Sequence, residues 1–152
     1  MRTSAITSLL LAAMAVGARA QGGPTGVEFG IQGLALLQRA EWWGAAMSGA
    51  YRPGGKARLS VTLGAGRTAG DWSGRGELLA HLLLAPARRT GAGLYGFGGI
   101  AGTTGPRDQG YLVLGLGLEG APARGSGWMV EAGVGGGLRL AAGWRWRRVR
   151  SP

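Results

Sequence analysis

The sequence predicts an all-β fold, namely an eight-stranded antiparallel up-and-down transmembrane β-barrel preceded by a signal peptide. Apolar residues alternate with polar or small residues over most of the chain, which is the period of a strand with two different faces. The alternating segments are close to the roughly nine to eleven residues that a tilted strand needs to cross a bilayer. Turns that contain Gly and Pro separate them. The 152 residues are enough for one such domain.

The first twenty residues have the pattern of a secretory signal peptide. A basic start at residues 1–3 precedes an apolar run over 5–17, and Ala18-Arg19-Ala20 is a small-x-small cleavage site. The run is too short for a membrane-spanning helix, and no other stretch reaches the required length of about 18 apolar residues. We therefore expect a signal peptide over 1–20, a barrel over 21–147 and a short basic tail over 148–152.

Composition excludes several classes of site. The absence of Cys removes disulfides, thiolate metal sites and a cysteine nucleophile, and the 33 Gly show no collagen period. The net charge of +10 and the Arg- and Trp-rich segment 144–150 are compatible with nucleic acid or with anionic lipid headgroups. Because an exported chain rarely meets nucleic acid, we expect contacts with lipid headgroups and no nucleic-acid partner. We also expect no cofactor.

Alternation defines eight candidate strands. It is clearest over 58–65, where Leu59, Val61 and Leu63 take one parity. The faces of the fifth segment cannot be assigned, because both parities there hold apolar residues and Gly. Turns fall at 52–55, 86–91 and 121–125, and short outer loops near 38–41, 68–75, 103–108 and 135–137. The candidate strands are 27–38, 41–52, 56–67, 75–85, 92–102, 109–120, 127–135 and 138–147.

Three features favour a membrane barrel over a soluble one, in which the apolar parity would face inward. The less apolar parity is mostly Gly, Ala, Ser and Thr, which suits a narrow lumen. Aromatic residues gather near strand ends, as in an interfacial girdle: Trp42, Trp43, Tyr51, Tyr111, Trp128, Trp144 and Trp146. Charges of both signs share the inward parity and predict a paired lumen network: Glu28, Arg58, Glu77, His81, Glu119, Glu131, Arg139 and Arg145.

The outward parity is predicted to face lipid. It comprises Leu59, Val61, Leu63, Leu78, Leu82, Leu112, Leu114, Leu116, Leu138 and Leu140. If the barrel closes, the first and last strands become neighbours, and Glu28 is then expected to reach Arg139 or Arg145.

By this pattern and length, residues 26–147 resemble the small OmpA/OmpX-type outer-membrane barrel superfamily. The resemblance implies periplasmic termini, insertion by the barrel-assembly machinery and contact with outer-membrane lipids. We further expect a monomer with a non-enzymatic, structural or very narrow, porin-like channel role. The short outer loops give no support to host binding.

Other motifs are weaker. The glycines of 115–120 match the GxGxxG dinucleotide fingerprint, but a turn follows instead of the helix that phosphate binding needs. The single histidine, His81, cannot build a metal site alone, and we expect it to bond a neighbouring carboxylate such as Glu77. Lipid A deacylases are eight-stranded barrels with a Ser two residues after the His, where this chain has Leu83. A lipid-modifying enzyme and a soluble periplasmic ligand-binding barrel remain alternatives.

Overall fold

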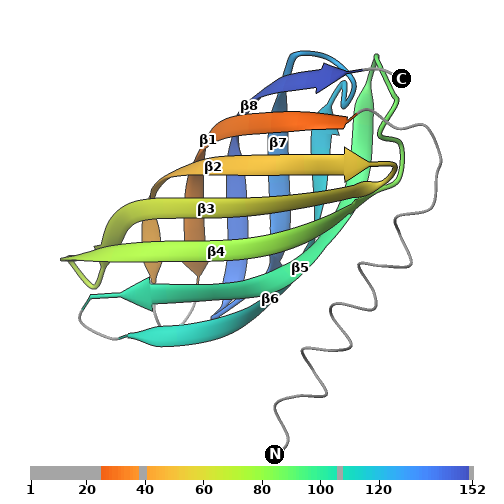
Figure 1. Cartoon of the computed structure of the whole chain (residues 1–152). Helices are drawn as coiled ribbons and strands as arrows, with labels where there is room; N and C mark the ends of the chain where they lie inside the picture. Colours follow the sequence, from red (N-terminus) through yellow and green to blue (C-terminus); the bar gives the residue numbers. More distant parts are fainter. Residues whose placement is uncertain (1–24, 38–40, 106–107, 151–152) are drawn as a thin grey trace, which may run out of the picture.

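The computed structural model describes residues 25–37, 41–105 and 108–150, which form one closed antiparallel barrel with each strand paired to the next (Figure 1). The predicted signal peptide over 1–20 and the cleavage site lie outside the described residues. The strands are β1 (Thr25–Leu37), β2 (Trp42–Gly54), β3 (Ala57–Thr68), β4 (Asp71–Leu83), β5 (Ala92–Thr104), β6 (Gln109–Gly120), β7 (Ser126–Val134) and β8 (Leu138–Arg150). The eight-stranded up-and-down barrel is therefore confirmed.

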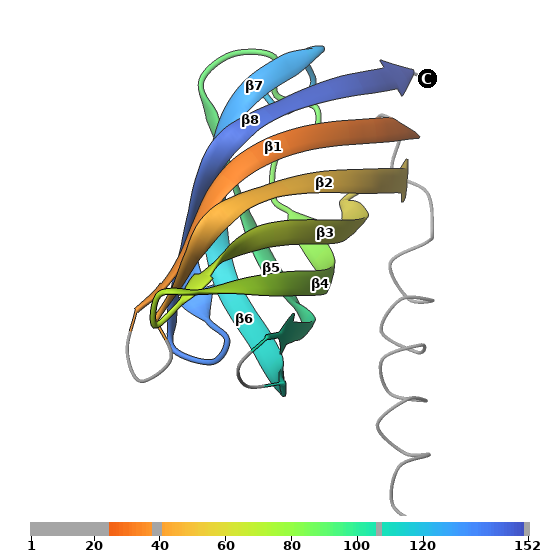
Figure 2. The same ribbon diagram turned by 90° about the vertical axis from the view of Figure 1, so that its left-hand side faces the viewer.

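Closure is made by β1 and β8, which lie side by side in Figure 2. Their register is continuous, from Leu37 opposite Leu138 to Gly26 opposite Val149. Strand β8 runs three residues beyond the predicted end at 147. We call the end where β1 begins and β8 finishes the terminal end. The β3–β4 and β5–β6 hairpins lie at the opposite end (Figure 1), which we call the hairpin end.

The β3–β4 connection is a tight turn, whereas the sequence predicted a loop over 68–75. Ala69 has φ of 50° and Gly70 has φ of 93°, and two positive φ values are what a type I′ hairpin turn requires. Such a turn matches the right-handed twist of the flanking strands, so pairing continues up to Thr68 and Asp71. The predicted loop was wrong because residues Asp71 to Gly74 pair with Ala65 to Thr68 of β3.

The two parities of each strand separate cleanly between the lumen and the outer surface. All ten residues predicted on the outward parity are exposed, by 39% at Leu59 to 82% at Leu112. Polar and charged residues occupy the inward parity, among them Glu28, Glu77 and Arg139. The barrel is thus apolar outside and charged inside, the inverse of a soluble barrel. Among the described residues, no helix is long and apolar enough to cross a membrane.

Two of the seven predicted girdle aromatics point the other way. Trp42 is buried in the lumen with Leu34, Leu36 and Ala141, and Tyr111 is half-buried on the inward parity. Neighbours on a strand face opposite sides, so Trp42 and Trp43 cannot share a surface. The outward aromatics form two groups. One at the hairpin end is Trp43 and Trp72, and one toward the terminal end is Phe29, Tyr51, Trp128 and Trp146, while Trp144 lies at the midpoint of β8.

The structure assigns the faces of β5, which the sequence left open. Tyr95 and Phe97 point into the lumen and are buried, so Gly96 and Gly98 lie on the outward parity. The register sets Tyr95 opposite Gly117 and Phe97 opposite Gly115 on β6. A Cβ added at either of these glycines would overlap the facing ring. These two glycines therefore make room for the aromatic rings inside the narrow barrel.

We predict that Gly117→Ala lowers the free energy of unfolding by about 1–3 kcal/mol, because the new methyl must displace the ring of Tyr95. The control is Gly49→Ala on the outer surface, where a Cβ meets no other described atom within 4 Å. This change should be neutral or stabilising by up to about 1 kcal/mol. Urea titration of the barrel in detergent measures both. Equal stability of the two variants would contradict the packing of Tyr95 over Gly117.

Candidate functional site

The candidate site is the lumen, where the structure places all eight residues of the predicted charge network. None of them is more than 5% exposed. They come from β1, β3, β4, β6, β7 and β8, and the inward parity of each strand delivers them to one space. They are Glu28, Arg58, Glu77, His81, Glu119, Glu131, Arg139 and Arg145.

Toward the hairpin end, Glu77 lies between two arginines. Arg75 Nε donates to its Oε1 at 2.8 Å. Arg139 makes a two-point contact, from Nε to Oε1 at 3.1 Å and from Nη2 to Oε2 at 2.8 Å. The other guanidinium nitrogen of Arg139, Nη1, donates to Glu131 Oε2 at 2.9 Å. Arg139 therefore joins carboxylates of β4 and β7, from opposite walls of the barrel.

Toward the terminal end, Glu119 on β6 contacts four arginines, one of which is Arg145. Arg58 lies 2.7 Å from its Oε2, Arg147 lies 3.0 Å from the same atom, and Arg52 lies 3.2 Å from Oε1. Arg52 also contacts Glu28 and donates to the carbonyl of Pro122 at 3.3 Å. The carboxylate of Glu119 thus ties β2, β3 and β8 to β6.

Arg145 connects the two halves. Its Nη2 donates to Glu131 Oε1 at 2.9 Å, and its Nη1 lies 3.5 Å from Glu119 Oε2. The result is one unbroken series of ion pairs from Arg75 to Glu28. Six strands contribute to this series, β2 joins it through Arg52, which contacts Glu28 and Glu119, and β5 joins through Tyr95, whose hydroxyl donates to Glu131 at 2.7 Å.

Aromatic rings fill the space beside the ion pairs. The guanidinium of Arg58 lies 4.7 Å from the centre of the Tyr95 ring, and that of Arg139 lies 5.1 Å from the Phe97 ring. A cation over a ring face is attracted by its quadrupole, by about 2 kcal/mol or more where water is excluded. The rings therefore stabilise guanidinium faces while carboxylates take the N–H groups.

His81 bonds differently from the prediction, which gave it a neighbouring carboxylate. Its Nδ1 lies 3.1 Å from Arg58 Nη2, and its Nε2 lies 2.8 Å from Ser60 Oγ. The prediction was wrong because the β3–β4 register places Arg58 opposite His81, whereas Glu77 is already bonded to Arg75 and Arg139. A guanidinium only donates, so His81 Nδ1 must accept and the ring proton lies on Nε2.

The prediction that Glu28 reaches Arg139 or Arg145 was also wrong. The β1–β8 register places Glu28 opposite Arg147, and its carboxylate contacts Arg52 and Arg58. Arg139 and Arg145 lie closer to the start of β8 than Arg147, and they form ion pairs with Glu77 and Glu131 instead. Parity gave the correct face for these groups, but the partner depends on register.

Sequence reasoning missed several members of the network. Arg75 shares a parity with Glu77, and Arg147 shares one with Arg139 and Arg145, so alternation contained a signal for both. Arg52 had been placed in a turn. Strand β2 continues to Gly54, and Arg52 keeps the inward parity of Trp42, Ala46 and Ser48, where it is fully buried. The missed residues are Arg52, Ser60, Arg75, Tyr95 and Arg147.

The described lumen holds six buried arginines and four buried glutamates, an excess of two positive charges. At most 6% of any of these side chains is exposed. Within 25–37, 41–105 and 108–150, no group of three or more His, Asp or Glu side chains is placed to hold a metal ion. Chemically, the arrangement ties the walls of the barrel together through ion pairs.

No protein-family model matches the sequence, and no curated protein matches it. Among solved structures, the chain is similar to the N-terminal β-barrel domain of OprF from Pseudomonas aeruginosa, with a TM-score of 0.62 and 15% sequence identity. The similarity covers 83% of this chain and 99% of that domain. The chain therefore has the fold of this barrel, and the resemblance to small eight-stranded outer-membrane barrels is confirmed at the level of the fold.

We predict that Glu77→Gln and Arg139→Gln each lower the free energy of unfolding by about 3–5 kcal/mol, because the first leaves buried Arg75 without a carboxylate and the second removes one arginine from both Glu77 and Glu131. The double variant should lose less than the sum, with a coupling of about 0.5–3 kcal/mol. The control pair is Glu41→Gln and Arg148→Gln, both at exposed positions, with changes within about 0.5 kcal/mol. Denaturant titration in detergent completes the cycle. Additive losses would mean that the lumen groups are hydrated individually.

Proposed function

We propose that this chain is a small outer-membrane β-barrel protein with a structural, non-enzymatic role and a lumen closed by its ion-pair network. The observation that carries the proposal is the inversion of the two faces. Large apolar side chains such as Leu112, Leu114 and Leu63 point outward from the strands, and charged groups point inward. A continuous apolar outer surface of this kind suits hydrocarbon, whereas a soluble ligand-binding barrel needs the opposite arrangement.

The distribution of outward aromatics supports the same proposal. Trp43 and Trp72 lie at the hairpin end, and Tyr51 and Trp146 lie toward the terminal end. Aromatic rings favour the level of lipid headgroups, so two groups separated by an apolar band fit a barrel that spans one bilayer. Export through residues 1–20, insertion by the barrel-assembly machinery and a monomeric state belong to this proposal.

The geometry at His81 supports a non-enzymatic role. In a Ser-His-acid hydrolase, the histidine takes the serine proton on an unprotonated Nε2 while a carboxylate holds Nδ1–H. Here Arg58 faces Nδ1, which leaves the ring proton on Nε2, directed at Ser60 Oγ. The imidazole therefore has the wrong tautomer to activate Ser60. Ser60 and His81 are also both buried in the lumen, away from the surface that contacts lipid.

We predict that the full chain, expressed with residues 1–20, fractionates with outer membranes and migrates differently on a gel before and after heating. Leu114→Arg, at a highly exposed position in the middle of β6, should cost about 2–4 kcal/mol of folding free energy in lipid vesicles. Thr104→Arg, at the exposed end of β5, should cost about 0–1 kcal/mol. Equal costs at the two depths, or a soluble periplasmic protein, would contradict membrane insertion.

We predict that the wild-type barrel gives no steady ion conductance in a planar bilayer, because the guanidinium of Arg139 bridges Glu77 and Glu131 across the lumen. Glu77→Ala/Arg139→Ala removes this bridge and should raise conductance. Glu41→Ala/Arg148→Ala, outside the lumen, should not. Steady ohmic conductance of the wild type would favour the narrow-channel role over the closed one.

A further inference from the structure

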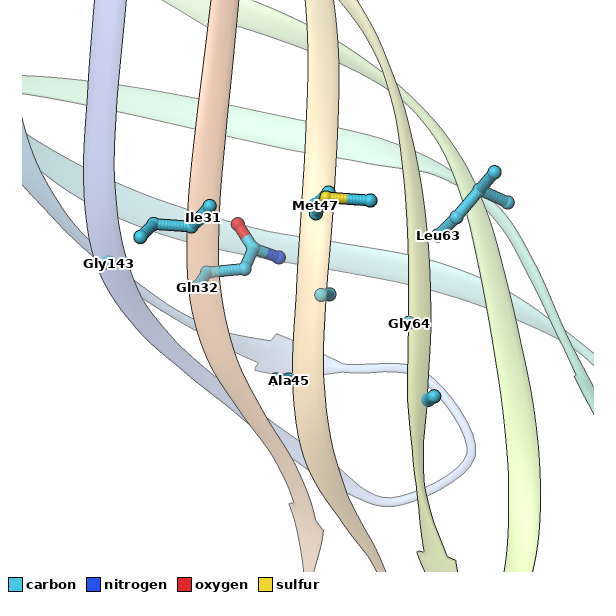
Figure 3. A pocket seen from close by; sticks show the side chains of 9 residues that line it. Ile31, Gln32, Ala45, Met47, Leu63, Gly64 and Gly143 are labelled. Carbon is cyan, nitrogen blue, oxygen red and sulfur yellow. The ribbon is translucent and has the colours of Figure 1, made fainter.

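The outer surface of the barrel has a hollow of about 710 Å³ over β8, β1, β2 and β3. This volume lies within the roughly 300–1,000 Å³ of ordinary small-molecule sites. Figure 3 shows Ile31, Met47 and Leu63 following one another across three strands, with Ala45 and Gly64 beside them. The lining is almost entirely apolar, and it belongs to the surface proposed to face lipid.

The register explains how the hollow forms. Ala45 faces Ala65 across β2 and β3, and Gly33 faces Ala45 across β1 and β2, so a row of very small outward residues makes the floor. The next row toward the terminal end is Ile31, Met47 and Leu63, which are also paired in register. Rows two residues apart are separated by about 6.8 Å. The large side chains therefore stand as a wall along one side of the floor.

A second hollow of about 520 Å³ continues the first over β7 and β8. Its lining includes Gly33, Ala132 and Ala142, and Gly33 faces Ala142 across the β1–β8 closure. The two hollows meet at β1 and together offer space for more than one extended apolar chain.

A cation lies beside the first hollow, on its hairpin-end side. Arg67 faces Trp43 on β2 and Trp72 on β4, and all three side chains are exposed on the outer surface. The guanidinium is held by a hydrogen bond from Nη1 to the carbonyl of Gly70 at 3.2 Å and lies 5.2 Å from the Trp72 ring centre. Among the residues that the structure describes, no carboxylate forms an ion pair with Arg67.

We propose that the Arg67 guanidinium and the outer hollow lined by Ala45 and Ala65 form a binding site for a phosphate-bearing membrane lipid. The phosphate lies against Arg67 between Trp43 and Trp72, and one acyl chain lies in the hollow against Ile31, Met47 and Leu63. An arginine presents a planar set of N–H donors that matches phosphate oxygens. The flanking tryptophans fix the depth of the headgroup, because their rings favour the membrane interface.

Charge identifies the occupant. A second copy of this chain would fill the apolar hollow but would bring the same Arg67 toward the interface, and like charges repel. A lipid with an anionic phosphate can pair its phosphate with Arg67 and place an acyl chain in the hollow at the same time. This inference rests on the proposed membrane location, since both parts of the site require that this surface contact a bilayer.

The experiment uses the full mature chain in detergent micelles, with folding and vesicle insertion checked first by heat-modifiable migration. Dipalmitoyl phosphatidic acid is titrated in, and the bound fraction is measured by native mass spectrometry. Dipalmitoylglycerol, which lacks phosphate, and dihexanoyl phosphatidic acid, which lacks long chains, are the matched probes. Arg67→Gln removes the cation, and Ala45→Leu/Ala65→Leu fills the hollow. Arg148→Gln and Ala80→Leu are controls at other outward positions.

We expect the wild type to bind dipalmitoyl phosphatidic acid more tightly than either matched probe. Arg67→Gln should weaken this binding about tenfold, the effect of losing one charge-assisted hydrogen bond, and should leave dipalmitoylglycerol unaffected. Ala45→Leu/Ala65→Leu should weaken the binding of dipalmitoyl phosphatidic acid and leave the binding of dihexanoyl phosphatidic acid unchanged. Both controls should bind like the wild type.

Three results would overturn the inference while insertion into vesicles succeeds. Binding that neither Arg67→Gln nor Ala45→Leu/Ala65→Leu changes would mean non-specific partition. If only Arg67→Gln weakens binding, and it does so equally for the long-chain and the short-chain phosphatidic acid, Arg67 would contact phosphate without an acyl-chain site beside it. Lipid-free dimers that Ala45→Leu/Ala65→Leu dissociates would mean that a second copy covers the hollow. Failure to insert into vesicles at all would instead reject the proposed membrane location.

Discussion

Pairing of buried charge is the constraint on which the rest of this barrel depends. An ion without a partner inside the lumen costs several kcal/mol, and each of the four buried glutamates contacts at least two arginines. The partners come from strands that are neighbours only after closure, such as Glu28 of β1 and Arg147 of β8. A register slip by one residue would move every charge of a strand to the outer surface. The network therefore stabilises the one register and the one closed topology in which these buried charges are paired.

The same alternation that places charge inside also limits the hydrophobicity of the chain. Leu112, Leu114, Leu116 and Leu118 give β6 an apolar outer face, but Glu119 and several glycines interrupt the run. A strand with both parities apolar would approach the continuous stretch of about 18 residues that inserts as a helix. In the proposed membrane location, a polar inward parity therefore lets the strands cross hydrocarbon as a closed sheet, while no described segment of them is long enough to cross as a helix.

Parity was readable from the sequence, and register was not. Period two gave the eight strands, the outward leucines and the inward faces of Glu77 and Arg139, because alternation is a local property. The partners of His81 and Glu28 were wrong because they depend on which residues face one another across strands, as Arg58 faces His81. Arg52 was missed for another reason: a turn was expected at 52–55, whereas β2 continues to Gly54 and Arg52 keeps the inward parity of Ser48. The faces of β5 became clear only when Tyr95 was set against Gly117.

Small residues have opposite consequences on the two faces of this sheet. Inside, the space above Gly115 and Gly117 is filled by the rings of Phe97 and Tyr95 from the same chain, so the lumen is packed. Outside, the row through Gly33, Ala45 and Ala65 has no such partner among the described residues, and the two hollows beside it stay open. A soluble protein rarely leaves this much apolar concave surface uncovered. In a bilayer, lipid chains supply the missing contacts, so small outward residues set where a chain can approach the backbone and large ones such as Met47 and Leu63 set its direction.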